Sequence, residues 1–211
     1  MRRAQAKQAT VEHITEPSNG GERTVKISLP YTVNVTIQGS CDLLFHAWNC
    51  EAIEAKAAAS KNSEAKKTDD VESYVVRAPD GTLTIPGNYF CGSICKAAKY
   101  RQDPRSPRKS AEDLFKAAIV STTLLAPLGT KKWDYLDKRR VQVQRQGINR
   151  VRPAMRAGWK ASFDIMVLAP EYIDKNILRE TIEHAGRLVG IGDFRPTFGR
   201  YGIVSFKEVL G

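Results

Sequence analysis

Strand-like and helix-like segments alternate along this chain of 211 residues without a regular period, and that order constrains its fold more than any other feature. Alternating or continuous apolar residues predict strands over 24–29, 31–39, 71–77, 82–85, 139–145, 159–169 and 200–209. Apolar residues at helical spacing predict helices over 48–59, 88–100, 110–125 and 174–189. Because no βαβ unit repeats, we expect an α+β fold with a mostly antiparallel sheet.

Three short signals mark the ends of these elements. The turn residues Pro79-Asp80-Gly81 predict a β-hairpin, because Pro presets φ and Gly tolerates a positive φ. Ser110 followed by Asp113 resembles a capping box that opens a helix. Asp174 is a candidate N-cap for the last helix, and Gly190 is expected to end that helix.

The chain is expected to hold one folded domain. Residues 1–22 are polar, lack sustained periodicity and end in a run of Ser, Asn and Gly, so they predict a flexible N-terminal arm. Residues 23–211 then form a single domain. Within it, Pro104 and Pro107 lie among mutually repelling cations over 101–110, so we expect an exposed basic loop without regular structure there.

Composition excludes several classes of protein. No run approaches the ~20 apolar residues of a membrane span, and Met1-Arg2-Arg3 is not followed by the apolar core of a signal peptide. We therefore expect a cytoplasmic protein without a membrane partner. The four cysteines are scattered and lack paired C-x-x-C spacing, which favours reduced thiols over disulfides or a zinc site. We expect neither a metal nor a cofactor.

The positive charge is concentrated in one segment. The formal net charge is +10, and residues 96–160 contain 17 Lys/Arg against 5 Asp/Glu, so this segment carries the whole imbalance. Such a block in an otherwise neutral chain is typical of a protein that binds a polyphosphate. The eight basic residues between 138 and 160 have no acidic residue among them. That stretch is either a surface that follows a nucleic-acid backbone or a charged edge strand that resists aggregation.

The basic side chains of this block, with two more beside a glycine-rich segment, are the candidate nucleic-acid contacts. They are Lys96, Lys99, Arg101, Arg105, Arg108, Lys109, Lys138, Arg139, Arg140, Arg145, Arg150, Arg152, Arg156, Lys160, Arg195 and Arg200. Stacking of bases on aromatic rings would add affinity for a single strand without sequence preference. The best-placed stacking candidates are Trp133, Tyr135 and Trp159, and further ones near the glycines are Tyr89, Phe198 and Tyr201.

The glycine-rich segment from 186 to 202 has two interpretations. Gly190, Gly192 and Gly199 would let backbone amides converge on a phosphate, with arginines interleaved. Alternatively, they form a tight turn that packs the last helix on the last strand. A dinucleotide-binding fingerprint follows a strand and enters a helix, whereas this segment follows a helix and enters a strand, so that function is excluded.

Two short motifs resemble a known group of proteins. Ile85-Pro86-Gly87-Asn88-Tyr89 leads into a helix, and Gly190-Ile191-Gly192-Asp193-Phe194-Arg195 leads into Gly199-Arg200-Tyr201-Gly202-Ile203 before the last strand. In these motifs the chain resembles the RAMP superfamily, the RRM-like RNA-binding backbone subunits of CRISPR effector complexes. The resemblance implies an RRM-like or ferredoxin-like antiparallel sheet with packed helices, RNA as ligand, and assembly with its own copies or with RAMP-type proteins. The chain also resembles phage-encoded proteins, which favours a phage relative of that fold acting in a host cytoplasm.

Three functions follow from these features and this resemblance. The favoured one is largely sequence-independent binding of single-stranded nucleic acid, RNA preferred over DNA, by an oligomer along the strand and without catalysis. The second is a phage protein that mimics or caps a CRISPR backbone subunit and inhibits it. The third is a metal-independent ribonuclease, since some RAMP relatives cut RNA with a histidine. His46 would then be the general base, and Lys96 or Arg101 would stabilise the developing charge.

Overall fold

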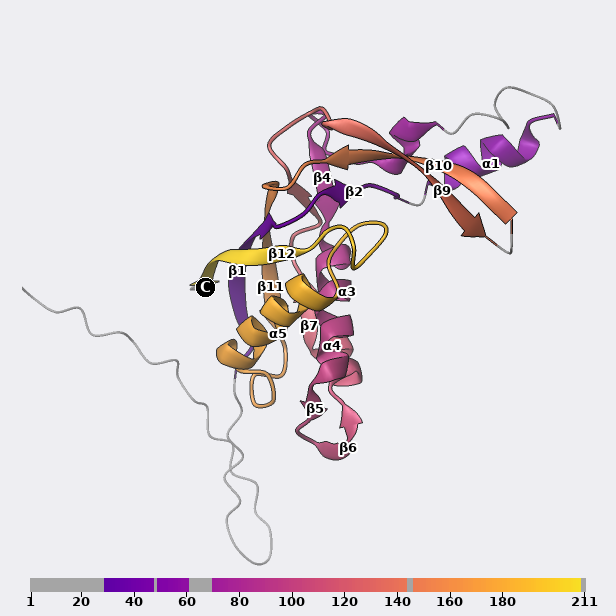
Figure 1. Cartoon of the computed structure of the whole chain (residues 1–211). Helices are drawn as coiled ribbons and strands as arrows, with labels where there is room; N and C mark the ends of the chain where they lie inside the picture. The colour runs from indigo at the N-terminus through magenta and orange to yellow at the C-terminus, as the bar shows by residue number, and fades with distance from the viewer. Residues whose placement is uncertain (1–28, 48, 61–69, 144–145, 210–211) are drawn as a thin grey trace, which may run out of the picture.

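The centre of the molecule is a four-stranded antiparallel sheet with the strand order β12-β1-β11-β7 (Figure 1). The computed structural model describes residues 29–47, 49–60, 70–143 and 146–209. The four strands are β1 (Tyr31–Gly39), β7 (Ile119–Ser121), β11 (Lys160–Val167) and β12 (Tyr201–Val209). The antiparallel sheet expected from the sequence is confirmed.

The alternation that predicts β1 also fixes which face of the sheet is buried. Val33, Val35 and Ile37 have no exposed surface and face the helices, since successive side chains of a strand point to opposite faces. On the other face, Asn34 Nδ2 donates to Asp164 Oδ1 at 2.6 Å. One face of the sheet is therefore apolar core, and the other is lined by paired polar side chains.

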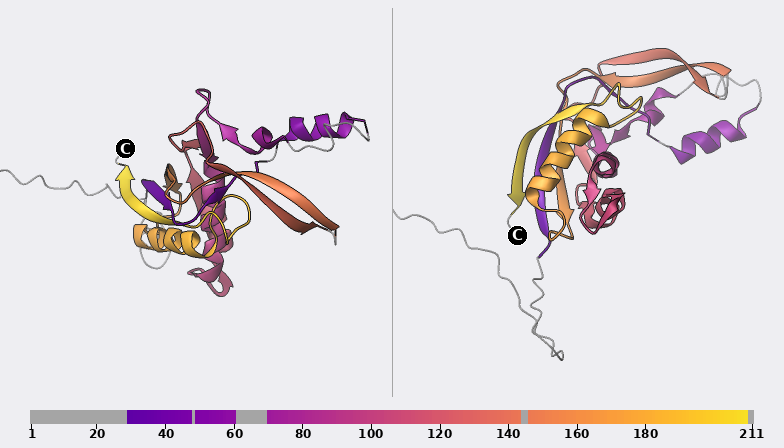
Figure 2. Two further views of the ribbon diagram at one scale, coloured as in Figure 1. Left: turned by 45° about the horizontal axis from the view of Figure 1, so that its top comes forward. Right: turned by 60° about the horizontal axis from the view of Figure 1, so that its bottom comes forward.

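Two helices cover the apolar face. Figure 2 (right) shows α5 (Lys175–Leu188) and α3 (Gly87–Ala97) on the same side of the strands. The rings of Phe90 on α3 and Phe163 on β11 stack with centroids 4.4 Å apart. The order β1, α3, β7, β11, α5, β12 is the βαββαβ order of ferredoxin-like and RRM-like folds, as expected.

The ends of α5 follow the predicted signals. Asp174 Oδ1 accepts a hydrogen bond from the Ile177 amide at 2.8 Å, so Asp174 is the N-cap. Gly190 has φ of 75° and its amide donates to the Ala185 carbonyl at 2.8 Å, which closes the helix. Both predictions are confirmed.

The helix predicted over 110–125 is wrong in extent. Helix α4 covers only Glu112–Ala118, and its N-cap is Ala111, with no capping side chain, so the Ser110 capping box does not form. The β-branched residues Ile119 and Val120 then join the sheet edge as β7, where such side chains pack better than in a helix. Strand β8 (Leu125–Pro127) follows.

The basic segment 101–110 is a short hairpin instead of an irregular loop. Strands β5 (Gln102–Asp103) and β6 (Ser106–Ser110) pair antiparallel. Asp103 fixes the turn, because its Oδ1 accepts from the Arg105 amide at 2.8 Å and its Oδ2 accepts from the Arg105 guanidinium at 2.8 Å. Pro104 lies in the turn and Pro107 in a two-stranded edge, where neither removes a needed amide donor.

A smaller sheet lies beside the start of α3. Its strands are β3 (Val76–Arg77), β4 (Leu83–Pro86) and β8, and the predicted turn between β3 and β4 forms with Gly81 at φ of 85°. The segment predicted as a strand over 71–77 begins as the 3-10 helix η1 (Val71–Tyr74). A second one, η2 (Ala98–Tyr100), extends α3.

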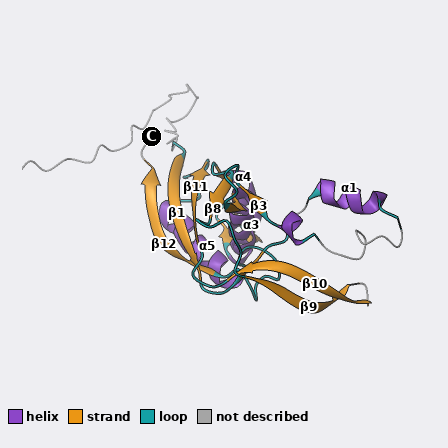
Figure 3. Ribbon diagram, turned by 90° about the horizontal axis from the view of Figure 1, so that it is seen from above, coloured by secondary structure: helices purple, strands orange, loops and turns teal. Residues whose placement is uncertain are grey.

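The most prominent feature missed by the sequence prediction is a long hairpin, which we call the ribbon. It joins β9 (Tyr135–Val143) to β10 (Gln146–Met155), and β10 also pairs with the short strand β2 (Leu43–Leu44). Figure 3 shows the ribbon extending away from the central sheet, on the same side as α1 (Cys50–Ala58). The segment after 145 was predicted to be a linker, whereas it is the second strand of the ribbon.

Some predictions lie outside the described residues. The N-terminal arm over 1–22 and most of the strand over 24–29 are among them. In the described part of the chain, no helix combines the length and the apolar character needed to cross a bilayer.

Candidate nucleic-acid interface

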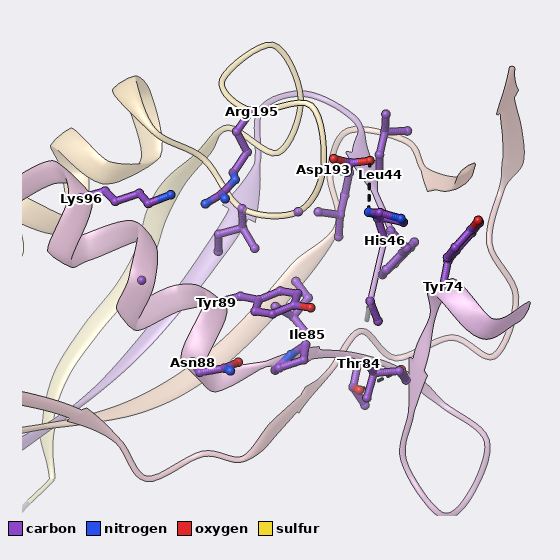
Figure 4. A pocket seen from close by; sticks show the side chains of 18 residues that line it. Leu44, His46, Tyr74, Thr84, Ile85, Asn88, Tyr89, Lys96, Asp193 and Arg195 are labelled. Carbon is purple, nitrogen blue, oxygen red and sulfur yellow. Dashed lines mark hydrogen bonds and ion pairs between the residues drawn. The ribbon is translucent and has the colours of Figure 1, made fainter. Parts of the chain in front are cut away.

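A cavity of about 370 Å³ forms where four segments of the chain meet (Figure 4). They are the stretch from β2 to Ala47, the end of η1 with β3, the junction of β4 with α3, and the glycine-rich segment that follows α5. The two motifs that resemble RAMP proteins therefore line one cavity, together with the histidine singled out in the sequence. The buried side chains of Leu44, Ile85 and Ile191 form apolar parts of its wall.

Four residues of α3 line this cavity, and one of them is Tyr89. A Cβ atom on Gly87 would lie 1.9 Å from the Thr123 carbonyl oxygen, so only glycine allows α3 to start this close to the chain that follows β7. Asn88, Gly92 and Lys96 then lie on one face of the helix at four-residue spacing, and all three line the cavity.

The glycine-rich segment is held by its own backbone. The Ile191 amide donates to the Gly199 carbonyl at 2.9 Å, and a Cβ on Gly199 would lie 1.6 Å from the Ile191 carbonyl oxygen. Gly192 has φ of 85°, and the Asp193 amide donates to the Leu44 carbonyl at 3.0 Å. These amides are used inside the protein, which favours the tight-turn interpretation over a phosphate cradle. What the segment presents to the cavity is the side chains of Asp193 and Arg195.

Asp193 links the cavity wall to the ribbon. Its Oδ2 accepts from Arg152 Nε at 2.8 Å, its Oδ1 accepts from the Phe194 amide at 3.0 Å, and its Oδ2 lies 3.8 Å from His46 Nδ1. Burial by itself raises the pKa of Asp193, but the hydrogen bonds from Arg152 and Phe194 outweigh it and hold the pKa below its usual value. Asp193 is therefore a carboxylate at neutral pH.

Three exposed cations line the open side of the cavity and its continuation. Lys96 and Arg195 belong both to the cavity and to an adjoining hollow of about 680 Å³, which extends past Lys99 and Tyr100. We call the cavity and this hollow together the groove. In the view of Figure 4, Lys96 and Arg195 converge at one end of the cavity, and His46 and Tyr74 lie at the other end. Tyr100 has 67% of its surface exposed.

Comparison with known proteins identifies the fold. No protein-family model matches the sequence, and no curated protein matches it either. The chain is similar to one in the cryo-EM structure of the type III-B Cmr-beta bound to cognate target RNA, with TM-score 0.53 and 10% identity over 86% of this chain and 61% of that chain. It is also similar to the crystal structure of Cmr6 from Pyrococcus furiosus, with TM-score 0.45 and 9% identity over 84% of this chain and 100% of that one.

The fold is RRM-like and is shared with the matched chain of the Cmr-beta structure. The expected fold class is thereby confirmed, and at 10% identity the likeness concerns the fold alone. The chain spans 61% of the length of the Cmr-beta chain that it matches. The comparison does not place the other candidate contacts, so each is located from the surroundings of its own side chain.

The ribbon carries cations on both of its faces. Lys138 and Arg140 are exposed on one face, and Arg139 opposes Arg150 in the register of the other face. Arg139 pairs with Asp137 at 2.5 Å, and its guanidinium lies 4.8 Å and 4.6 Å from the ring centroids of Phe194 and Phe198. Arg139 therefore packs the ribbon against the glycine-rich segment.

Arg152 was predicted to contact nucleic acid, and its position contradicts this. The residue is 1% exposed, because its guanidinium is enclosed between Asp193 and the ring of Tyr74, whose centroid lies 4.7 Å away. Arg145 lies outside the described residues.

The remaining cations do not line the groove. In Figure 1 the β5–β6 hairpin, with Arg105, Arg108 and Lys109, lies at the opposite end of the molecule from the ribbon. Arg101 pairs with Glu180 at 2.5 Å. The others, all exposed, are Arg156 near Tyr135, Lys160 at the start of β11 and Arg200 before β12.

The predicted stacking residues are mostly engaged elsewhere. Trp159 is 4% exposed, and its Nε1 donates to the Cys41 carbonyl at 3.0 Å, so the prediction for this residue is wrong. Trp133 packs partly against the core, and the Tyr135 hydroxyl donates to Asp42 at 2.6 Å. Tyr201 is also buried. The Phe and Tyr rings that line the groove are Phe45, Tyr74, Tyr89, Tyr100 and Phe194, of which only Tyr89 was named as a stacking candidate in the sequence prediction.

The described residues contain no group of three or more His, Cys, Asp or Glu side chains arranged to hold a metal ion. The four cysteines are free thiols. Burial raises the pKa of Cys95 to about 11, so this thiol stays protonated at neutral pH.

Proposed function

We propose that the protein binds single-stranded nucleic acid, RNA in preference to DNA, along the groove and the ribbon, and that it catalyses no reaction. The observation that carries this proposal is the meeting of the two RAMP-like motifs at a groove with exposed Lys96, Lys99 and Arg195. Lys and Arg at such a surface bind phosphates and set the position of a strand without reading its sequence. RNA is favoured because the similar Cmr-beta chain comes from a structure bound to target RNA.

The proposal extends to assembly. Several copies would bind along one strand, or one copy would join a RAMP-type protein partner, as the resemblance implies. A phage origin stays a prediction. If the protein instead mimics or caps a CRISPR backbone subunit, it would bind that protein tightly and free RNA weakly.

The test is fluorescence anisotropy with a labelled single-stranded RNA of about 20 nucleotides, the matching DNA and an RNA duplex, at about 50 to 300 mM salt. We expect the highest affinity for single-stranded RNA and a steep loss of affinity with salt. Equal affinity for RNA and DNA would contradict the RNA preference. No binding to either strand at low salt would contradict the whole proposal and favour the protein-partner alternative.

A pair of double variants with the same loss of charge locates the binding surface. Lys96→Ala with Arg195→Ala removes two cations from the groove, and Arg108→Ala with Lys109→Ala removes two from the β5–β6 hairpin. We expect the groove variant to lose at least about tenfold in affinity at low salt and the hairpin variant to lose less than threefold. Equal losses of affinity in the two variants would mean that the positive charge of the protein attracts RNA without a defined binding site.

A ribonuclease is the second candidate, and one contact favours it. His46 and Lys96 line the same cavity, and Asp193 lies 3.8 Å from His46 Nδ1, so a histidine, an acidic partner and a cation are present together. Arg101, the other cation considered for this role, pairs with Glu180 and does not line the cavity. Cleavage of the RNA in the presence of EDTA by the wild type, abolished in His46→Ala, would establish this activity and overturn the non-catalytic proposal.

A further inference from the structure

We propose that the cavity at the end of the groove takes one unstacked nucleotide, with the base inside and the phosphate at Lys96 and Arg195. This inference rests on the proposed function, since it names what one position of the bound strand does there. The cavity would then be a preformed site for a single nucleotide, in contrast to a surface that only attracts phosphates.

The size of the cavity fits one nucleotide and no more. Its volume of about 370 Å³ lies near the lower end of the range of roughly 300–1,000 Å³ found for small-ligand sites. A run of stacked bases is too large to enter a cavity of this volume. One nucleotide turned out of the stack could enter it, and turning out a base of a single strand costs less than doing so in a duplex.

The wall of the cavity suits a planar ring. Leu44, Ile85 and Ile191 lie in its wall. The ring of Tyr89 borders the space in Figure 4, on a different side from Tyr74, whose ring packs against Arg152 and His46. Aromatic and apolar side chains of this kind take up an unstacked base, because every base has an apolar face.

Three of the polar side chains at the cavity could bind the parts of a nucleotide. Asn88, at the start of α3, lines the cavity with an amide that can both donate to and accept from the edge of a base. Lys96 and Arg195 lie together at one end, where they can bind the phosphate that follows the base. A nucleotide is a ligand with this order of parts: ring, then sugar, then phosphate.

Contacts within the protein fix the charged residue in the wall of the cavity, Asp193. Asp193 accepts hydrogen bonds from the buried Arg152 and from the Phe194 amide, so its charge is compensated within the protein. The two exposed cations at the cavity therefore remain available to an anion. A site shaped in advance loses less free energy on binding, since fewer side chains must be ordered.

One substitution can fill the cavity without altering its polar groups. Gly92 lines it from the middle of α3, and a Cβ added there meets no atom within 4 Å. Gly92→Leu should therefore occupy the space without backbone strain, and it replaces a poor helix former with a good one. Gly202→Leu on β12 is the matched control, because a Cβ there also meets no atom within 4 Å and the position does not line the cavity.

The first measurement compares these variants for binding of the single-stranded RNA, after thermal unfolding has shown that both fold. We expect Gly92→Leu to lose about tenfold in affinity and Gly202→Leu to lose less than twofold. Equal affinities of the two variants, with salt-dependent binding intact in the wild type, would overturn the nucleotide cavity and leave the proposed function standing. No RNA binding by the wild type would contradict the proposed function itself.

The second measurement separates a nucleotide of a strand from a free nucleotide and from a simple anion. Calorimetry with adenosine 5′-monophosphate, uridine 5′-monophosphate and inorganic phosphate is run on the wild type and on Gly92→Leu. If a monophosphate binds the wild type and not Gly92→Leu, the result supports the nucleotide cavity. If the wild type binds a monophosphate but no RNA, the ligand of the cavity is a free nucleotide. Phosphate binding as tight as that of the nucleotides and unchanged in Gly92→Leu would overturn the inference.

Discussion

Arg152 is the residue whose role differs most from its sequence prediction. It lies in a stretch without acidic residues, which predicted an exposed cation. Its partner Asp193 is 41 residues away in sequence and reaches it only because the glycine-rich segment folds against the ribbon. Arg139 also pairs with an acid, Asp137, but this one is a neighbour in sequence that lies just outside the stretch from 138 to 160. A count of charges along a sequence cannot detect acids that tertiary structure brings in.

The burial of Arg152 makes it a stability residue. Removing one partner of a buried ion pair leaves the other charge poorly solvated, so we expect Arg152→Ala to lower the free energy of unfolding by about 3 kcal/mol. Arg140→Ala, on the exposed face of the same ribbon, should change it by less than about 0.5 kcal/mol. Urea unfolding measures both. Equal midpoints for the two variants would contradict the ion pair.

Asp193 predicts a dependence of stability on pH. Its pKa is lower in the folded protein than its usual value, so its stabilising contribution is fully present above the unfolded pKa of about 3.9 and is lost as pH falls through the folded pKa. We expect the difference in unfolding free energy between the wild type and Asp193→Asn to be constant from about pH 7 to pH 5 and to shrink below about pH 4. A difference that stays constant to about pH 3 would show that the pKa is not lowered.

At the scale of elements, the sequence prediction succeeded for helices and strands whose position depends only on their own pattern of apolar residues. Alternation predicted β1, and helical spacing predicted α3 and α5, with caps at α5 only, because a buried face alone decides these elements. Strand β10 was missed because Gly147 and Pro153 look like turn residues. Pro153 has no amide hydrogen to donate to a neighbouring strand, but its carbonyl accepts from the Phe45 amide at 3.0 Å, a contact from over a hundred residues away.

The candidate site was predicted only in part, for the same reason. Lys96, Arg195 and His46 were named from their residue types and motifs, but nothing in the chain order brings them to one cavity. Tyr74 and Tyr100 carried no signal, since each lies in a short 3-10 helix without a motif. The pairing of strands and the fold of the glycine-rich segment bring these residues together.

The glycine-rich segment offers a test of its structural role. Gly199 has φ of 73°, and a Cβ there would meet the Ile191 carbonyl oxygen, so we expect Gly199→Ala to lower the free energy of unfolding by about 2 kcal/mol or more. Gly202→Ala, where a Cβ meets nothing, is the control and should change it little. Thermal and urea unfolding report the result. If Gly199→Ala were as stable as the control, the close approach at this turn would be wrong.

At the scale of the whole molecule, the basic block of the sequence divides into separate surfaces. The groove and the ribbon are joined through Arg139, which lies over Phe194 and Phe198 of the glycine-rich segment. The β5–β6 hairpin lies at the far end of the molecule (Figure 1). One strand could follow the groove and the ribbon, and the hairpin adjoins η2, at the end of the groove opposite the ribbon.

This division predicts how charge losses combine. Each phosphate contact of a single strand contributes about 0.7 to the slope of log affinity against log salt, so removing two contacts should reduce the slope by about 1.4. We expect that reduction of the slope from the groove variant, Lys96→Ala with Arg195→Ala. We expect it again from the ribbon variant, Lys138→Ala with Arg140→Ala. The fourfold variant should show the sum of the two reductions, because distant sites act independently. Anisotropy titrations at several salt concentrations measure these slopes. If the ribbon variant kept the wild-type slope, the strand would not follow the exposed face of the ribbon, and the groove alone would account for binding.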